Sequence, residues 1–152
     1  GFPAAIGAQL GCPNDLVVAV VGDGGFQMTL AELSTAALQR VPIKILIIDN
    51  RYLGMIRQWQ ELFFDQRLSG CELEGNPDFV KLGEAYGVKG FRIRRAGDVT
   101  KALAYNDGPC IIHAEVVKED NVFPMIPAGA AVKDMLIEKP KDRKLEKPVG
   151  ST

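Results

Sequence analysis

The chain has 152 residues, 47% of them hydrophobic, and a formal net charge of −1. This is enough apolar material for one packed domain, and the near-neutral charge gives no electrostatic case for nucleic acid or an anionic membrane as a partner. The apolar runs are too short to span a bilayer. Three cysteines without Cys-x-x-Cys spacing argue against a disulfide framework or a structural zinc site, so we expect a cytoplasmic location.

Two short, β-branched runs open the predicted fold. Residues 16–21 and 43–48 are almost wholly apolar, which is typical of strands buried on both faces of a parallel sheet, and we expect both to be central strands. Between them, apolar residues recur at helical spacing from about Thr29 to Gln39. A right-handed crossover through this helix would bring the carboxyl ends of the two strands to one edge of the sheet.

A polar motif follows each of these strands. Gly22-Asp23-Gly24 ends the first strand, and Asn50 ends the second, 27 positions after Asp23. The glycines alone are equally compatible with an ordinary turn. However, a carboxylate beside a phosphate is repulsive unless a cation lies between them, and Asp23 and Asn50 offer the hard oxygen ligands that Mg²⁺ prefers. The pair therefore predicts a metal-bridged diphosphate site at the edge where α/β sheets bind ligands.

The alternation of strands and helices continues downstream. A helix is predicted from Asn76-Pro77, as N-cap and first helical residue, to Tyr86, with Gly87 at the C′ position. The other predicted elements are a mobile loop over residues 68–76, a strand over 91–94, a helix from a cap at Asp98 through 104, and a parallel strand over 110–117. Together they predict an α/β fold, a doubly wound and mainly parallel sheet with helices on both faces, over residues 1–132. A flexible, lysine-rich tail is predicted over 133–152.

A resemblance to a known family begins at Gly22. From there the sequence reads GDGGFQMTLAELSTAALQRVPIKILIIDNRYLGMIRQWQELFF, which resembles the thiamine-diphosphate motif, and in particular its form in the large catalytic subunit of acetolactate synthase. The segments GFPAAIGAQLGCP, NPDFVKLGEAYGVKGFRI and VFPMIPAGAA agree with the same family. The resemblance covers residues 1–135.

The resemblance also implies roles for individual residues. Asp23, Asn50 and the backbone carbonyl of Tyr52 would bind Mg²⁺, while Met55 and Trp59 would line the substrate pocket. The cofactor-binding set that it implies is Gly22, Asp23, Gly24, Gly25, Met28, Asn50, Tyr52, Gly54 and Met55. Without the resemblance, the i, i+4, i+8 stripe of Met55, Trp59 and Phe63 predicts core packing of a helix, and for Phe63 we keep that interpretation.

Three further residues near these motifs carry expectations of their own. Asp49 stands where the family usually has the first Asn of an Asn-Asn pair, and a second charge about 7 Å away would add about 2 kcal/mol of repulsion. We therefore expect Asp49 to point away, accept backbone hydrogen bonds or be offset by the cation, and we do not count it as a ligand. His113, the only histidine, is predicted to be a buried structural residue of an inner strand. Arg57 and Glu61 are predicted to form a solvated helix-face pair.

The family's function would then be the synthesis of branched-chain amino acid precursors. The resemblance implies that pyruvate is decarboxylated on thiamine diphosphate and that the two-carbon unit is joined to a second 2-oxoacid. Because the sequence opens without Met inside a motif, we expect a piece of a longer polypeptide that is inactive alone. No catalytic residue is predicted in it, because the glutamate that activates the cofactor would belong to a separate pyrimidine-binding domain.

The expected partners follow from the same resemblance. FAD would be bound mostly outside this chain, and a homo-oligomer with room for a regulatory small subunit is expected. Two alternatives stay open. One is a different thiamine-dependent enzyme, such as oxalyl-CoA decarboxylase, glyoxylate carboligase or pyruvate oxidase. The other is a non-catalytic cofactor-docking or oligomerisation module.

Overall fold

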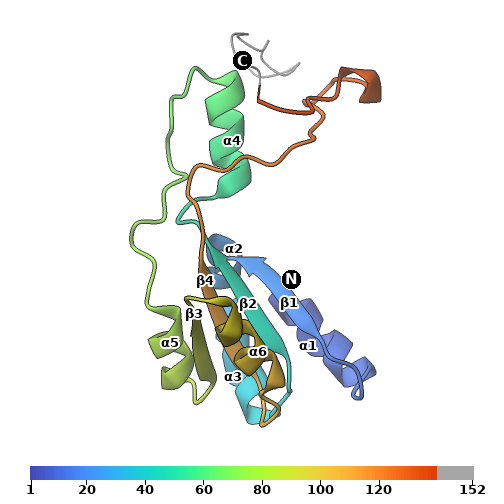
Figure 1. Ribbon diagram of the computed structural model, residues 1–152, viewed down its shortest axis with the longest axis vertical. Coiled ribbons are helices and arrows are strands. Elements are labelled where there is room, and N and C mark those ends of the chain that lie inside the picture. The colour runs from blue at the N-terminus through green and yellow to red at the C-terminus, as the bar shows by residue number, and fades with distance from the viewer. Residues whose placement is uncertain (140–152) are drawn as a thin grey trace. The chain divides into compact units, whose positions relative to one another are not determined.

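The computed structural model describes residues 1–139, which fall into two compact units. Unit 1 comprises Gly1–Arg51 and Leu73–Val117, and unit 2 comprises Tyr52–Glu72 and the chain from Lys118 onward. Unit 1 contains α1 (Phe2–Gly11), β1 (Val18–Gly22), α2 (Asp23–Gln27), the 3₁₀ helix η1 (Leu30–Glu32), α3 (Leu33–Leu38), β2 (Lys44–Asp49), α5 (Phe79–Ala85), β3 (Lys89–Ile93), α6 (Ala96–Ala104) and β4 (Cys110–Glu115). Unit 2 contains α4 (Gly54–Phe63) and the 3₁₀ helix η2 (Val132–Asp134) (Figure 1).

Unit 1 is built on a parallel sheet. Within the described residues its strand order is β1-β2-β4-β3, and every neighbouring pair is parallel. The predicted α/β class and the parallel pairing of the first two strands are confirmed. The expectation that both are central is wrong for β1, which lies at the edge of this sheet because β2 pairs with β4 on its other side. Val20 of β1 is 65% exposed, because its side chain points to the face that α6 does not cover over this strand.

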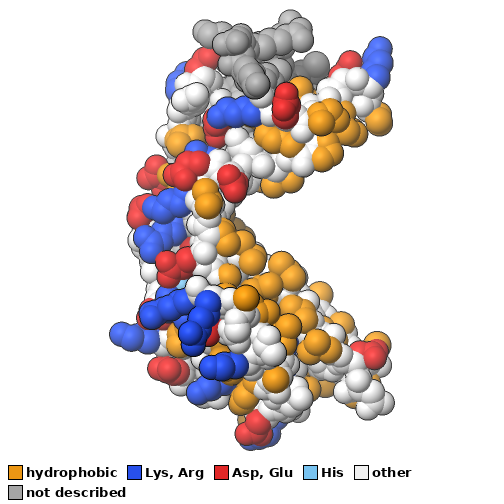
Figure 2. Space-filling model, in the orientation of Figure 1, with side chains coloured by type: hydrophobic (Ala, Val, Ile, Leu, Met, Phe, Trp, Pro, Cys, Tyr) orange, Lys and Arg blue, Asp and Glu red, His pale blue; other side chains and the backbone are white. Residues whose placement is uncertain are grey.

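Helices cover both faces of this sheet, as predicted. On one face, α1, α2, α3 and α5 contribute Phe2, Phe26, Leu33 and Phe79 to the main core, together with strand residues such as Ile47. On the other face, α6 packs over β3 and β4, in a smaller cluster of Ala102, Cys110 and Ile112. The part of this second face over β1 and β2 is less covered, and Figure 2 shows hydrophobic side chains gathered there on the surface.

Two predicted helix starts are wrong. The N-cap of α5 is Asp78, whose carboxylate accepts hydrogen bonds from the backbone N–H groups of Val80 and Lys81, so Asn76 lies outside the helix. The helix α6 begins after Arg95, and Asp98 is its third residue. Its carboxylate still caps the helix, because it accepts hydrogen bonds from the N–H groups that precede the first turn. Gly87 follows α5 with φ +72°, the left-handed conformation expected at C′.

Unit 2 consists of α4 and the segment 118–139, which we call the strap. Gln58 is 2% exposed and both donates to the carbonyl and accepts from the N–H of Val122, at 2.9 and 2.7 Å. Glu61 accepts hydrogen bonds from Asn121 and from Lys139 of the strap. The side chains of Arg57 and Glu61 are only 12% and 10% exposed, so their ion pair is not the solvated pair that we expected. It is enclosed because the strap covers this side of α4.

The predicted loop and tail fall partly in unit 2. Residues 68–76 contain no helix or regular strand, and an isolated antiparallel bridge joins Tyr52 to Glu72. Of the predicted tail, Leu136 forms an antiparallel bridge with Met125, and residues 140–152 lie outside the described part of the chain. Residues 1–139 include no helix that is long and apolar enough to cross a membrane.

Candidate functional site

The carboxyl edge of the sheet in unit 1 gathers the polar residues that the motif singled out. In the register of the two strands, Gly22 of β1 pairs with Ile48 of β2. Asp23 therefore begins α2 directly beyond one strand end, while Asp49 and Asn50 lie at the end of the neighbouring strand. The two ligand-bearing strand ends are adjacent and point the same way, as the motif predicted. Asp23 is 1% exposed and Asp49 is 5% exposed, so both carboxylates are buried.

Asn76 bridges these two carboxylates. Its side-chain Nδ2 donates to Asp23 Oδ2 at 2.7 Å and to Asp49 Oδ1 at 3.0 Å. Asp49 Oδ1 also accepts the backbone N–H of Arg51 at 3.2 Å, which is one of the arrangements expected for it. Asp49 nevertheless does not point away from Asp23, because the amide of Asn76 allows the two acids to lie close together.

The other oxygen of Asp49 is held by His113. His113 Nε2 lies 2.9 Å from Asp49 Oδ2, and its Nδ1 lies 3.2 Å from a guanidinium nitrogen of Arg92. Since a guanidinium can only donate, Nδ1 must accept and Nε2 must carry the proton given to Asp49. Arg92 is itself paired with Asp78 and Glu115, at 2.8 Å each. His113 is 3% exposed, which agrees with the prediction of a buried residue in an inner strand.

The pKa values of Asp23 and Asp49 are shifted in opposite directions. Burial raises the pKa of Asp23, and the nearby Asp49 raises it further, more than the hydrogen bonds from Asn76 and Gly24 lower it. Burial also acts to raise the pKa of Asp49, but the hydrogen bond from His113 and its other partners outweigh burial and lower it. The surrounding protein therefore stabilises the charged form of Asp49, whereas it disfavours the charged form of Asp23.

Two of the glycines beside Asp23 are next to open space. A Cβ added at Gly22 or at Gly25 would meet no described atom within 4 Å. Gly22 has φ −75° and ψ 158°, a conformation open to any residue, so its backbone does not require glycine. Gly24 is buried beside Asp23. Open space next to bare backbone is what a bound anion needs in order to reach backbone N–H groups.

This arrangement fits a hydrated divalent cation. A buried carboxylate with a raised pKa, next to a second carboxylate, is favoured in its charged form when a cation is bound beside it. Within residues 1–139, no group of three or more His, Cys, Asp and Glu side chains could hold a metal ion by itself. Mg²⁺ commonly takes only one or two protein carboxylates and completes its shell with phosphate and water, so Asp23 and the amide oxygen of Asn50 fit that pattern.

The remaining predicted residues are divided between the units. Met28 is the C-cap residue after α2 in unit 1 and is 75% exposed. Tyr52 and Gly54 belong to unit 2, as do Met55 and Trp59. The structure thus brings the glycine motif together with Asn50 in one unit, and brings Met55 together with Trp59 in the other.

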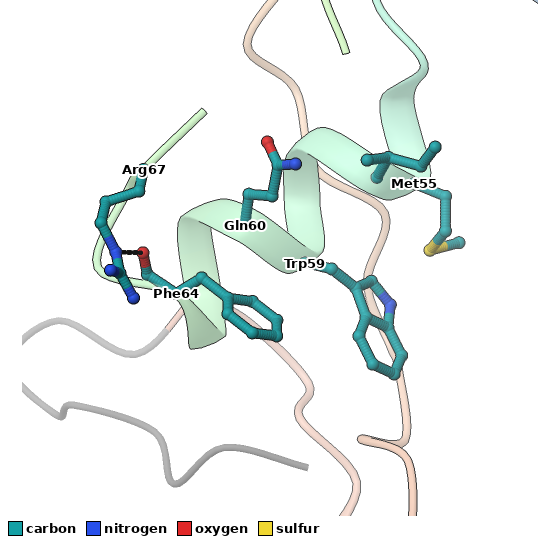
Figure 3. Close-up of a pocket in the computed structure, with 6 residues that line it drawn as sticks. Met55, Trp59, Gln60, Phe64 and Arg67 are labelled. Atoms are coloured by element: carbon teal, nitrogen blue, oxygen red, sulfur yellow. Dashed lines mark hydrogen bonds between the residues drawn. The ribbon is translucent and has the colours of Figure 1, made fainter. Parts of the chain in front are cut away.

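Met55 and Trp59 line an open pocket on α4. The pocket has a volume of about 520 Å³, and Figure 3 shows Trp59 and Met55 on one side of the helix, with Phe64 and Arg67 at its end. Met55 is 58% exposed, whereas Phe63, the third member of the stripe, is 4% exposed and packs against the ring of Trp59 at 5.5 Å. The core role predicted for Phe63 is confirmed. Because Met55 is exposed, it does not act as a core residue in the described structure.

A family model for "Thiamine pyrophosphate enzyme, C-terminal TPP binding domain" matches residues 1–114. The chain belongs to this family. The match includes the whole glycine motif, Asp49, Asn50 and His113, and it identifies the carboxyl edge of the sheet as part of a thiamine pyrophosphate-binding domain.

Named relatives of the domain are acetolactate synthases. This chain is 45% identical over 139 residues to the acetolactate synthase isozyme 2 large subunit of Escherichia coli, and the match covers 90% of this chain and 25% of that protein. It is 42% identical over 139 residues to the mitochondrial acetolactate synthase catalytic subunit of Saccharomyces cerevisiae, covering 90% of this chain and 20% of that protein. These relatives confirm the resemblance predicted from the sequence. The domain spans about a quarter of the length of the first of them.

A solved structure also resembles the domain. The thiamine diphosphate-dependent 4-hydroxybenzoylformate decarboxylase of Rhodococcus jostii RHA1 matches with a TM-score of 0.72 and 34% identity, covering 80% of this chain and 23% of that one. This likeness supports the predicted fold.

Three members of the site are not predicted by the sequence pattern. The pattern excludes Asp49 from the ligands, gives His113 only a structural role and places Asn76 at a helix cap. Signals did exist, because a buried-strand histidine needs a polar partner and an acid at a strand end is a candidate for it. The pairing itself depends on β2 and β4 being neighbours, which the sequence pattern alone does not specify.

Proposed function

We propose that the chain is the diphosphate-binding domain of an acetolactate synthase, which joins a two-carbon unit from pyruvate to a second 2-oxoacid. The observation that carries the proposal is the buried carboxylate of Asp23 at the strand edge, beside Asn50 and the open backbone of the glycine motif. The 45% identity to an acetolactate synthase over nine-tenths of the chain supports the choice of reaction within the family.

The residues of this chain would bind and orient the cofactor. Thiamine diphosphate, when bound, supplies the electron sink for decarboxylation and carbon–carbon bond formation. Asp23 and Asn50 would hold Mg²⁺ against the diphosphate, with the Tyr52 carbonyl as a third ligand. The N–H groups of Gly24 and Gly25 would donate hydrogen bonds to phosphate oxygens.

Substrate choice is proposed to lie in unit 2. The exposed side chain of Met55 and the half-buried side chain of Trp59 would contact the 2-oxoacid acceptor, and the size of the pocket leaves room for it. In the full-length enzyme, Trp59→Leu should therefore change the ratio of acetolactate to acetohydroxybutyrate formed from mixed pyruvate and 2-oxobutyrate. An equal loss of both products would show that Trp59 only packs the helix.

The rest of the active site is proposed to come from outside this chain. A pyrimidine-binding domain, in the same or a partner subunit, would supply the glutamate that activates the cofactor, and FAD would bind mostly elsewhere. A cytoplasmic homo-oligomer, with a regulatory small subunit as a further partner, is part of the same proposal. It predicts that the full-length enzyme forms acetolactate from pyruvate and that the 152-residue chain alone does not. Turnover by the chain alone would contradict the proposed division of the site.

A second candidate is a thiamine-dependent decarboxylase that releases an aldehyde. The structural likeness to 4-hydroxybenzoylformate decarboxylase favours it, although the identity, 34%, is lower than to the synthases. The two reactions differ in their products. Full-length enzyme given pyruvate alone should form acetolactate if it is a synthase. Rapid release of benzaldehyde-type products from an aromatic 2-oxoacid, without acetolactate, would favour the decarboxylase.

A further inference from the structure

Asn76 lies in a loop, yet its side chain forms three hydrogen bonds. Its Nδ2 contacts Asp23 and Asp49, and its Oδ1 accepts a hydrogen bond from Gln27 Nε2 at 2.7 Å. Its backbone N–H donates to the carbonyl of Leu73 at 3.1 Å. The side chain therefore has a partner for both amide protons and for its oxygen, and all of these partners belong to unit 1.

The two protons of Asn76 have different surroundings. One goes to Asp49, which is anchored independently by His113 Nε2 at 2.9 Å and by the N–H of Arg51. The other goes to Asp23 Oδ2. Because the first contact is fixed by the surrounding protein, the second one acts with the backbone N–H of Gly24 and the contact with Asp49 to set the direction in which the Asp23 carboxylate turns. An amide also lets two like charges approach without neutralising either of them.

We propose that Asn76 is a positioning residue that orients the Asp23 carboxylate toward a divalent cation, with the Asp49–His113 pair as its anchor. This inference rests on the proposed function, in which Asp23 binds the cation. Asn76 holds one oxygen of Asp23 so that the other faces the cation and the diphosphate. Residues that hydrogen-bond to a ligating carboxylate without binding the metal themselves typically contribute about 10- to 100-fold to metal affinity.

The alternative is that the amide of Asn76 blocks the cation site, and this role predicts the opposite change in metal affinity. If the amide of Asn76 stood in the place of the cation, it would have to leave before a metal ion could bind. Removing it would then tighten binding. The orienting role is favoured because Gln27 also donates a hydrogen bond to the amide oxygen, so the Asn76 side chain is held at both its oxygen and its nitrogen.

The test is titration of the full-length enzyme with Mn²⁺ in the presence of thiamine diphosphate, followed by electron paramagnetic resonance. Asn76→Ala should weaken Mn²⁺ binding by about 10- to 100-fold, and its spectrum at saturating Mn²⁺ should have an altered line shape. A purely structural role would not change that line shape. Asn14→Ala, on an exposed asparagine, is the matched control and should bind as the unaltered enzyme does.

Asp23→Ala separates the inference from the proposed function. If it abolishes Mn²⁺ binding while Asn76→Ala binds as tightly as the unaltered enzyme, or more tightly, the role of Asn76 is overturned and the role of Asp23 stands. If Asp23→Ala binds normally, or the unaltered full-length enzyme binds no Mn²⁺, both are overturned. Should Asn76→Ala fail to fold by circular dichroism, Gln27→Ala decides instead. That variant frees the Asn76 amide without touching either carboxylate, and unchanged affinity in it contradicts the inference.

Discussion

Replacing Asp23 by asparagine should stabilise the metal-free chain at neutral pH. Asn76 Nδ2 lies 2.7 Å from an oxygen of Asp23 and 3.0 Å from an oxygen of Asp49, so these two oxygens are within about 6 Å of each other. Two unit charges at that distance repel by about 3 kcal/mol at an effective dielectric of about 20. The hydrogen bonds of Asn76 and His113 offset part of this repulsion, so we expect a gain of about 1–3 kcal/mol in the free energy of unfolding.

The pH dependence of this gain follows from Asp23. Its pKa is raised by burial above the ordinary value of 3.8, so the folded chain keeps this proton at a higher pH than the unfolded chain does. The stabilisation from the protonated acid is complete below the ordinary value and is lost as pH rises through the raised one. The advantage of Asp23→Asn should therefore be largest at pH 7 and should shrink as the pH falls toward 4.

Urea unfolding in EDTA, at pH 7 and at pH 4, measures this difference. Each kcal/mol corresponds to about 2–4 °C in Tm for a chain of this size, so thermal unfolding gives a second measure. Asp15→Asn is the matched control, because Asp15 is exposed. Added Mg²⁺ with thiamine diphosphate should raise the Tm of the unaltered chain and not that of the variant. The reasoning is refuted if Asp23→Asn is no more stable than the unaltered chain at pH 7.

Three further substitutions test hydrogen bonds and packing in the two units. His113→Ala should cost about 2–4 kcal/mol in urea unfolding, because it leaves the Oδ2 atom of the buried Asp49 carboxylate without the hydrogen bond from His113, and a loss below 1 kcal/mol would contradict that role. Gln58→Ala should raise the hydrogen-exchange rate of the Val122 N–H at least tenfold, since about 1.4 kcal/mol of lost protection is a tenfold change; an unchanged rate would mean that Gln58 does not hold the strap. Gly90→Ala should destabilise unit 1 by about 1–3 kcal/mol, because the new Cβ would lie 2.7 Å from the side chain of Val80. Gly97→Ala, which meets no atom within 4 Å, is its control and should unfold no more easily than the unaltered chain.

The sequence pattern predicts the positions of the first two strands well, because short, apolar and β-branched runs strongly favour strands. The runs at 16–21 and 43–48 are apolar and β-branched, and the structure has strands at Val18–Gly22 and Lys44–Asp49. The pattern did not reveal that β1 is an edge strand. Apolar composition reports that a residue is suited to burial, whereas the neighbours that bury it are set by strand order.

Only the part of the candidate site that has local sequence signals is predicted. The Gly-Asp-Gly motif and Asn50 are local signals, and their strand ends lie side by side in unit 1. The link from Asp23 through Asn76 and Asp49 to His113 joins segments that are 27 to 64 positions apart, so no local pattern contains it. Asn76-Pro77 has the composition of a helix start, but the amide forms hydrogen bonds to two carboxylates and Asp78 caps the helix instead.

The exposed edge of β1 has a practical consequence for work with this polypeptide. One side of that strand pairs with β2, and the backbone N–H and C=O groups of its other side have no described neighbour in the sheet. An unprotected parallel edge is a template on which another strand can add. Samples of the isolated 152-residue chain should therefore be kept dilute during refolding and checked for aggregation before any cofactor titration is interpreted.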